Sequence, residues 1–396
     1  MSVYRELGVK RIINCVSTTS PLGSSVTYPE VMEAMKEAST HYVAMDQLQE
    51  KAGAMIAGMT GSEAAIVTCG CSAAITMAAA ACMMKGTPLE KYQPSGYRAP
   101  REEGEWLTWM QKLPDSEGLR NEIIHQRGHL NIYSQALRVA GAKLVLVGTT
   151  TECRPDEIEE KITDKTAAIA FTGLYSSRGL PLEDVLGIAK NHDLPVIMDA
   201  AYTLPPRSNL KRWASMGVDL VCYSGGKAIR GPTDTGILCG RRDLVNLAAI
   251  QMSPHHGVGR GFKVDKTQIA GLLKTLEIFV SQDDDVEFAA REAKARYIID
   301  VLKSIPVVKD VKQVVPNKGL LRAWPVVTFT LDEKLLGMST REVVELLYAG
   351  DPGIWVYYDH VLCPGGVTMN TENLLEGEEQ ILTDRLEEIL GSRRTS

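Results

Sequence analysis

Two residues whose side chains can do covalent and acid–base chemistry lie at the ends of apolar runs of the chain. Lys227 follows the run Val218–Ser224, and Asp199 ends the run Val196–Asp199. A lysine amine can form a Schiff base with the aldehyde of pyridoxal phosphate (PLP), and a carboxylate can keep the pyridine nitrogen of that cofactor protonated. Each residue alone has an ordinary explanation, because strand-end aspartates often cap helices and loop lysines are usually solvated. Their joint placement predicts a PLP site.

The segments that carry these residues belong to an alternation of short apolar runs and helical patterns between about residues 50 and 240. Most of the runs lack polar alternation, which is typical of strands buried on both faces. The pattern predicts an α/β fold whose large domain has a mostly parallel, seven-stranded sheet that binds ligands at the carboxyl ends of its strands. Lys227, Asp199 and Ser224 fall at such ends. The expected strands are Ala65–Cys69, Glu122–His125, Lys143–Val147, Ala167–Phe171, Pro195–Asp199, Asp219–Tyr223 and Thr235–Cys239.

Helical patterns separate these strands and dominate the C-terminal third. Those between the strands are Ser72–Met84, Asn131–Ala140, Asp156–Ile162 and Leu182–His192. Later come the helical patterns Thr267–Val280, Asp285–Lys303, Thr340–Tyr348 and Gly377–Leu390, with strand patterns at Val326–Thr330 and Trp355–Tyr358. We therefore predict an N-terminal segment (1–45), a large PLP-binding domain (46–265, with an insertion at 86–120), and a linker helix with a smaller C-terminal α+β domain (266–396).

A glycine-containing turn at Gly70-Cys71-Ser72 is a candidate phosphate site. It follows an expected strand and opens an alanine-rich helix, where free N–H groups and the helix dipole attract anions. Ser72 either adds a hydroxyl to the phosphate or caps the helix. Ser224, shortly before Lys227, is a second phosphate candidate or a solvated hydroxyl. The turn matches neither the P-loop nor the dinucleotide fingerprint, so we do not expect a nucleotide.

Composition excludes several classes of function. The 396 residues are 44% hydrophobic and 23% charged, and their net charge of −6 argues against a nucleic-acid partner. The eight cysteines lack metal or redox spacing, and the seven histidines form no metal motif, so we expect reduced thiols in the cytosol and no metal site. Met1–Lys10 does not resemble a signal peptide, and Ala73–Met84 is too short to span a bilayer. We expect a cytoplasmic protein with no membrane partner.

Several segments of the chain resemble one family of enzymes. The stretch 219–236 is similar to the Schiff-base segment of selenocysteine-synthase-like PLP enzymes, which have fold type I of the aspartate aminotransferase superfamily. Similar segments occur in order from about Asn14 onwards, at 121–129, 147–150, 175–179 and 259–266. The chain begins almost at the catalytic domain and is acidic, so it is more similar to the members likened to D-glucosaminate-6-phosphate ammonia-lyase than to the tRNA-dependent enzymes.

The resemblance implies roles for particular residues. Lys227 would form the Schiff base, and Asp199 would pair with the pyridine nitrogen. The phosphate ligands would be Gly70, Cys71, Ser72 and Ser224. His129 or Gln126 would lie at the face of the cofactor ring, and either is otherwise an ordinary polar residue at a strand end.

The resemblance also implies that further basic residues bind the substrate or contact a partner subunit. Arg178 or Arg322 would bind the substrate carboxylate, unless they form structural ion pairs. Arg260 and Lys263 would contribute charge across the interface of a homodimer or higher homo-oligomer, and their alternative is a solvated loop.

The expected function is that of a PLP-dependent lyase acting on a small amino acid or amino sugar acid. Lys227 would remove the Cα proton through an aldimine, a group at Cβ would leave by elimination, and ammonia would be released. An aminotransferase and a racemase or aldolase-type enzyme use the same lysine and aspartate and remain alternatives. A scaffold of the same fold without catalytic activity is a further alternative.

Overall fold

The computed structural model describes residues 3–92, 105–316 and 323–391, and the chain forms two compact units. Unit 2 contains residues 27–281 and 318–322, and unit 1 contains 1–26, 282–317 and 323–396. We placed domain boundaries at 45/46 and 265/266, whereas the units change at 26/27 and 281/282. The difference arises because α2 (Pro29–Ser39) packs against α11 (Lys266–Ser281), so both helices belong to unit 2.

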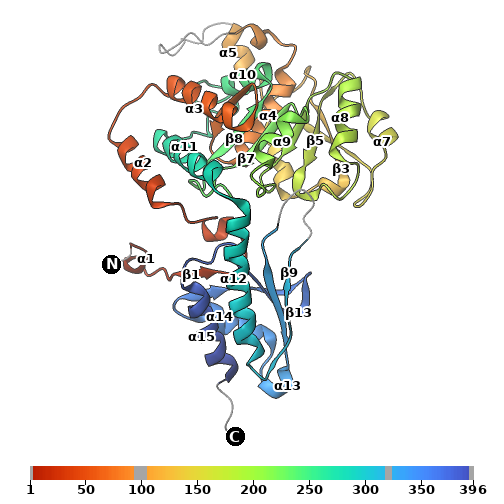
Figure 1. The fold of residues 1–396 in the computed structure, drawn as a ribbon. Helices are drawn as coiled ribbons and strands as arrows, with labels where there is room; N and C mark the ends of the chain where they lie inside the picture. The colour runs from red at the N-terminus through yellow and green to blue at the C-terminus, as the bar shows by residue number, and fades with distance from the viewer. Residues whose placement is uncertain (1–2, 93–104, 317–322, 392–396) are drawn as a thin grey trace. The chain divides into compact units, whose positions relative to one another are not determined.

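A seven-stranded sheet forms the centre of unit 2 (Figure 1). All of its strands are parallel except β8, which is antiparallel to both of its neighbours. This architecture confirms the predicted mostly parallel sheet, including the number of strands. In order across the sheet, the strands are β2 (Ala64–Thr68), β8 (Gly236–Gly240), β7 (Leu220–Ser224), β6 (Val196–Asp199), β5 (Thr166–Thr172), β3 (Glu122–Gln126) and β4 (Lys143–Val147).

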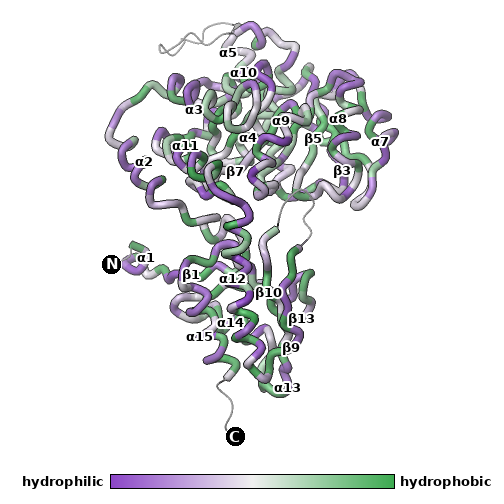
Figure 2. Tube along the Cα trace, viewed as in Figure 1, coloured by the Kyte–Doolittle hydropathy of each residue, from purple (hydrophilic) through white to green (hydrophobic). Residues whose placement is uncertain are grey.

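Alternating residues of the central strands pack on opposite faces of this sheet. On β7, Val221 and Tyr223 belong to one buried cluster, and Leu220 and Cys222 belong to the other. The first face is covered by α3 (Met45–Thr60), α8 (Leu182–Asn191), α9 (Asn209–Ser215) and α11. The second is covered by α4 (Cys71–Met84), α6 (Gln135–Val139) and α10 (Arg242–Ile250). Burial on both faces explains why the inner strands β5, β6 and β7 are mostly apolar. Figure 2 colours the chain by hydropathy.

Short elements occupy the connections of unit 2. The region predicted as one helix over Asn131–Ala140 is instead the 3-10 turn η4 (Ile132–Ser134) followed by α6, because the side chain of Asn131 caps the turn. The predicted insertion 86–120 contains η2 (Pro88–Lys91) and α5 (Glu105–Met110), and its residues 93–104 lie outside the described residues. The other short elements are η3 (Arg127–His129), α7 (Pro155–Glu159) and η5 (Gly173–Tyr175).

Unit 1 has α+β architecture, as predicted for the smaller domain. Its antiparallel sheet has the order β12 (Tyr357–His360), β13 (Cys363–Asn370), β10 (Val326–Leu331) and β9 (Val308–Val314). A second sheet joins β1 (Ile12–Asn14) to β11 (Gly353–Trp355). The predicted strand Trp355–Tyr358 is therefore split between two sheets. The helices are α1 (Val3–Glu6), α12 (Asp284–Lys303), α13 (Glu333–Leu336), α14 (Thr340–Ala349) and α15 (Glu378–Gly391).

Three further features of the structure concern its cysteines, its helix lengths and its metal-binding side chains. All eight cysteines are free thiols. Within the described ranges, no helix combines the length and apolarity needed to cross a bilayer, and no cluster of three metal-binding side chains occurs.

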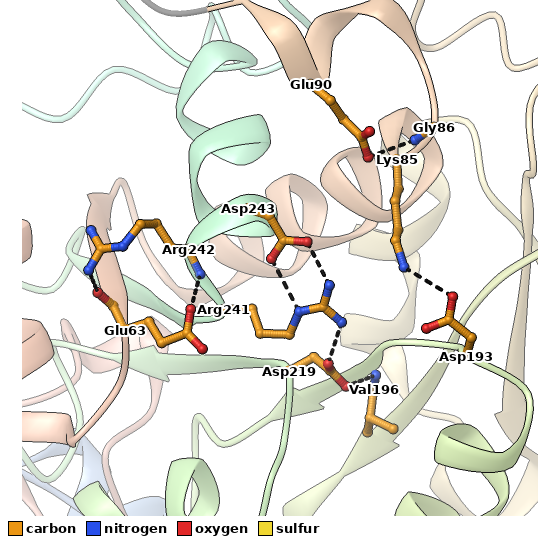
Figure 3. A network of polar contacts seen from close by, with 10 residues as sticks. All are labelled: Glu63, Lys85, Gly86, Glu90, Asp193, Val196, Asp219, Arg241, Arg242 and Asp243. Atoms are coloured by element: carbon orange, nitrogen blue, oxygen red, sulfur yellow. Dashed lines mark hydrogen bonds and ion pairs between the residues drawn. The ribbon is translucent and has the colours of Figure 1, made fainter.

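An ion-pair network lies at the amino ends of β6 and β7, away from Asp199 and Ser224 (Figure 3). Asp219 accepts hydrogen bonds from the Val196 N–H at 2.8 Å and from Arg241 Nη1 at 2.9 Å. Arg241 also binds Asp243. The network joins the starts of two neighbouring strands to the end of β8.

The Asp219→Ala variant is expected to be less stable by about 2 kcal/mol, because it leaves the buried Val196 N–H without its acceptor and removes the Arg241 pair. The melting temperature of the purified variant measures this loss. Glu33→Ala, which breaks the exposed pair with Lys36, is the control and should melt like the wild type. Equal melting temperatures for all three proteins would contradict the role of Asp219.

Candidate active site

Asp199 is the last residue of β6, and one of its two carboxylate oxygens, Oδ1, contacts neighbouring groups of the protein. Its Oδ1 accepts the Ala201 N–H at 3.0 Å, and the Cys71 thiol lies 3.9 Å from the same oxygen. Within the described part of the chain, no hydrogen bond reaches Oδ2. Burial raises the pKa of Asp199, while the Ala201 N–H, Lys227 and Cys71 act in the opposite direction. The second oxygen is thus available to a ligand that brings its own positive charge.

Lys227 lies in a tight loop between β7 and β8. The Gly225 N–H donates to the Thr235 carbonyl at 2.8 Å, and the Gly231 N–H donates to the Gly225 carbonyl at 2.7 Å. A Cβ atom at Gly226 would lie 2.6 Å from Thr233 Cα, so the glycine before the lysine allows the loop to close. The loop therefore fixes the backbone of Lys227 beside the carboxyl ends of the strands.

The amine of Lys227 is close to two aromatic rings. Its Nζ lies 5.2 Å from the ring centroid of Tyr202 and 5.6 Å from that of Tyr133. No carboxylate forms an ion pair with this amine among the residues that the structure describes. Both tyrosines are absent from the residues predicted from the sequence.

The turn before α4 has an uncapped helix N-terminus. Gly70 is the N-cap at φ 99°, and no side chain caps the helix, so Ser72 is not the capping residue. A Cβ atom at Gly236 would lie 2.7 Å from the Cys71 nitrogen, and the register places Gly236 beside both Thr68 and Ser224. The turn thus crosses closely over the start of β8 towards Ser224.

The two residues predicted at the cofactor ring are held by other contacts. Gln126 Oε1 accepts the Leu180 N–H at 2.6 Å, and its Nε2 donates to the Leu180 carbonyl at 3.2 Å. His129 is fully buried, accepts the Thr172 N–H at 3.2 Å and packs edge-on against Phe171. Neither side chain lines the pocket beside Asp199.

Burial of the His129 ring perturbs its protonation. It lowers the pKa of His129 to about 4, and His125 acts in the same direction. The backbone carbonyl groups of Arg178 and Tyr175 partly oppose this shift. The imidazole is therefore neutral at physiological pH and accepts a proton only in acid.

Acid is expected to destabilise the protein through His129. The unfolded chain binds this proton near pH 6.5 and the folded chain only near pH 4. The unfolding free energy therefore falls as the pH drops between these values, by up to about 3 kcal/mol. His129→Asn keeps a hydrogen-bond acceptor without titrating, so its melting temperature should fall less between about pH 7 and pH 4.5. The same acid sensitivity in both proteins would exclude His129 as the cause.

Arg178, Arg260 and Lys263, which the sequence analysis singled out, do not lie together. Exposed Arg178 lies over the Tyr175 ring at 4.7 Å and beside Gly128, at the same end of the sheet as Asp199. Arg260 contacts Ser253 at 3.5 Å, and Lys263 is exposed. In the described residues neither contacts Lys227 or Asp199. Arg322 lies outside the described residues.

A pocket lies beside Asp199. Its polar lining consists of Asp199, His125, Asn131, Tyr133, Ser134 and Thr172. These residues come from three separate strand ends and the segment before α6. Of the six, only Asp199 was predicted as a site residue from the apolar run that it ends. The short motif Asn131–Ser134, a helix-capping box, was the one available local signal.

Comparisons with known proteins place the chain in a family. The family model of L-seryl-tRNA selenium transferase matches residues 116–291. The chain is 31% identical, over 98% of its length and 92% of the relative's, to a 5'-C-glycyluridine monooxygenase-decarboxylase from a Streptomyces species. The chain belongs to the selenocysteine-synthase-like family. It is also 28% identical, over 98% of both chains, to D-glucosaminate-6-phosphate ammonia lyase from Salmonella typhimurium.

A solved structure supports the same relationship. The structure of a D-glucosaminate-6-phosphate ammonia-lyase superposes with a TM-score of 0.84 at 27% identity and covers 100% of both chains. The predicted family and its fold type I are therefore confirmed. Members of the selenocysteine-synthase-like family are PLP-dependent enzymes.

The site geometry fits PLP on three separate points. Lys227 offers an amine without an ion-pair partner in the described chain, and Asp199 offers a carboxylate oxygen without a hydrogen bond there. The N-terminus of α4 offers uncapped N–H groups, and the absence of a side chain at Gly236 keeps the turn close to Ser224. These three features match the aldehyde, the pyridine nitrogen and the phosphate of the cofactor.

Proposed function

We propose that the protein is a PLP-dependent lyase that releases ammonia from an amino acid or amino sugar acid bearing a hydroxyl group on Cβ. The observation that carries the proposal is the full-length similarity to an ammonia lyase in both sequence and structure, together with the placement of Lys227 and Asp199. The net reaction converts a 2-amino-3-hydroxy acid into a 2-keto-3-deoxy acid and ammonium. It needs no oxidant and no keto-acid acceptor.

Each group of site residues has a proposed part in holding PLP. Lys227 binds the aldehyde, and Asp199 binds the pyridine nitrogen through its Oδ2. The phosphate is bound by the α4 turn and the end of β7, through Gly70, Cys71, Ser72 and Ser224. This assignment follows from uncapped N–H groups in the turn and from the short path between the turn and β7.

The chemistry divides between cofactor and protein. When bound, PLP supplies an electron sink for the electron pair left at Cα. Lys227 takes the Cα proton, because its amine is the basic group at the carboxyl ends of β6 and β7. Asp199 keeps the pyridine nitrogen protonated, and the tyrosine rings beside Lys227 exclude water from its amine.

Substrate binding and assembly form the remaining part of the proposal. Arg178 binds the substrate carboxylate, because it is an exposed guanidinium at the same sheet end as Asp199. Arg322 is the second candidate from the sequence. We also propose a cytoplasmic homodimer or higher homo-oligomer in which Arg260 and Lys263 act on a neighbouring subunit.

A second candidate function comes from the relative that is 31% identical, which is named a monooxygenase-decarboxylase. A reaction of that class consumes O2 and releases CO2 from the substrate. In this chain Lys227 and Asp199 are proposed to hold the cofactor for either reaction, so the two candidates are distinguished by their products.

One experiment separates these functions. The purified protein with PLP is incubated with 2-amino-3-hydroxy acids and amino sugar acids, phosphorylated or not, without a keto acid and without oxygen. Equal amounts of ammonia and keto acid are expected. If product forms only after a keto acid is added, the protein is an aminotransferase. If product forms only after O2 is added, with consumption of O2 and release of CO2, the protein is an oxygenase. Failure to bind PLP would exclude all three.

A further inference from the structure

We propose that Tyr133 supplies the aromatic ring that stacks on the cofactor ring; this inference rests on the proposed function. The residue lies in the turn η4, seven residues after the end of β3. In this role Tyr133 would position the cofactor in the site. The proposal prefers Tyr133 to Gln126 and His129, the residues expected there from the sequence, because both of these side chains are buried and contact other parts of the protein.

The first argument is that Tyr133 presents a free surface to the site. A ring that stacks on a ligand must have one face open when that ligand is absent. Tyr133 is 47% exposed and lines the pocket that contains Asp199 and Thr172. Its ring centroid is also 5.6 Å from Lys227 Nζ, so a cofactor joined to Lys227 and Asp199 lies beside this ring.

The second argument is that the alternatives have no such face. His129 is 0% exposed, and its ring is enclosed by the edges of Phe171, at 4.6 Å between centroids, and His125, at 6.4 Å. Gln126 binds both backbone groups of Leu180, and a Cβ at Gly179 would collide with its amide. Both side chains support the floor of the site instead of facing the ligand.

The third argument is that local contacts hold Tyr133 in place. The Tyr133 N–H donates to Asn131 Oδ1 at 2.7 Å, and the Asn131 N–H donates to Ser134 Oγ at 3.1 Å. Ser134 Oγ lies 3.4 Å from His125 Nε2, which ties the turn to β3. These contacts hold the backbone of Tyr133 in place, which limits the positions that its ring can take. Offset stacking of aromatic rings adds to the binding of a planar ligand.

The test measures PLP affinity and the cofactor absorption band in Tyr133→Ala, Tyr133→Phe, His129→Asn and Ile132→Ala. Apoprotein is titrated with PLP, and the Kd and band position are recorded, with melting temperatures to verify folding. Tyr133→Ala should bind PLP about tenfold more weakly and shift the band, whereas Tyr133→Phe keeps the ring and should stay within about twofold. Ile132, the neighbouring residue, is 82% exposed and serves as the matched control.

Each other outcome overturns the inference. Wild-type affinity and an unshifted band in folded Tyr133→Ala would show that the ring does not contact the cofactor. A larger loss in folded His129→Asn than in Tyr133→Ala would assign the ring face to His129. An equal loss in Tyr133→Phe and Tyr133→Ala would point to the hydroxyl group. Absence of PLP binding by the wild type would instead remove the proposed function, and the inference with it.

Discussion

The Lys227→Ala variant is expected to release ammonia at least about a thousandfold more slowly than the wild type, because it lacks both the amine for the cofactor aldehyde and the base for the Cα proton. Its fold should be unaffected. Lys227 is only half-buried and forms no ion pair with a carboxylate among the described residues, so the packing around it should survive its removal. Initial rates at saturating substrate, with melting temperatures of the apoproteins, measure the two effects separately.

Lys227→Arg is the matched variant for this experiment. It keeps the positive charge beside Tyr202 and Tyr133 but is a very weak base and nucleophile. It should be as inactive as the alanine variant. Activity within about tenfold of the wild type in either variant would show that another amine performs the reaction.

The Asp199→Asn variant is expected to lose activity by about a hundredfold or more and, as apoprotein, to gain stability at neutral pH. The activity falls because an amide does not keep the pyridine nitrogen protonated. The stability rises because burial raises the pKa of Asp199, so the ionised carboxylate is unfavourable in the folded state. The asparagine oxygen can still accept the Ala201 N–H.

The wild type and the Asp199→Asn variant also test how the effect of Asp199 on stability depends on pH. A carboxyl group with a raised folded-state pKa makes the protein less stable as pH rises from its ordinary pKa, near 4, through the raised value. The melting temperature of apo Asp199→Asn should therefore exceed that of the wild type at pH 7, and the gap should narrow in acid. A lower melting temperature for the variant at pH 7 would show that the carboxylate stabilises the apoprotein through Lys227.

Sequence reasoning located the large sheet because its strands are buried on both faces. Such strands are mostly apolar and stand out, as in Val196–Asp199 and Thr166–Thr172. Strand β9 was missed because the valines of Val308–Val314 recur at every third position, without the alternation of a strand, and none of its residues is fully buried. Helix α3 was also missed, although Leu48, Ala52 and Ile56 recur at helical spacing.

Errors at element boundaries have non-local causes. Trp355 pairs with Asn14 and Tyr357 pairs with Thr368, so one apolar run serves two sheets whose partner strands are distant in sequence. Sequence reasoning has the same limit in the candidate active site, because it does not show contacts between residues that are distant in sequence. Asp199 and Lys227 could be found because the first ends an apolar run and the second follows one closely, whereas Tyr133 and Tyr202 approach Lys227 only through the fold.

The pairing of β2 with the antiparallel β8 has a consequence for how the protein is made. β2 stands at the edge of the sheet, so its neighbour there is β8, which follows more than 160 residues later at Gly236–Gly240. During translation, the α4 turn is therefore synthesised long before β8, the strand that it contacts at Gly236. Until β8 arrives, the apolar helix α4 has no complete sheet to cover it, and nascent chains are exposed to aggregation. The proposed cofactor site is therefore expected to form only after β8 has been translated, late in the synthesis of unit 2.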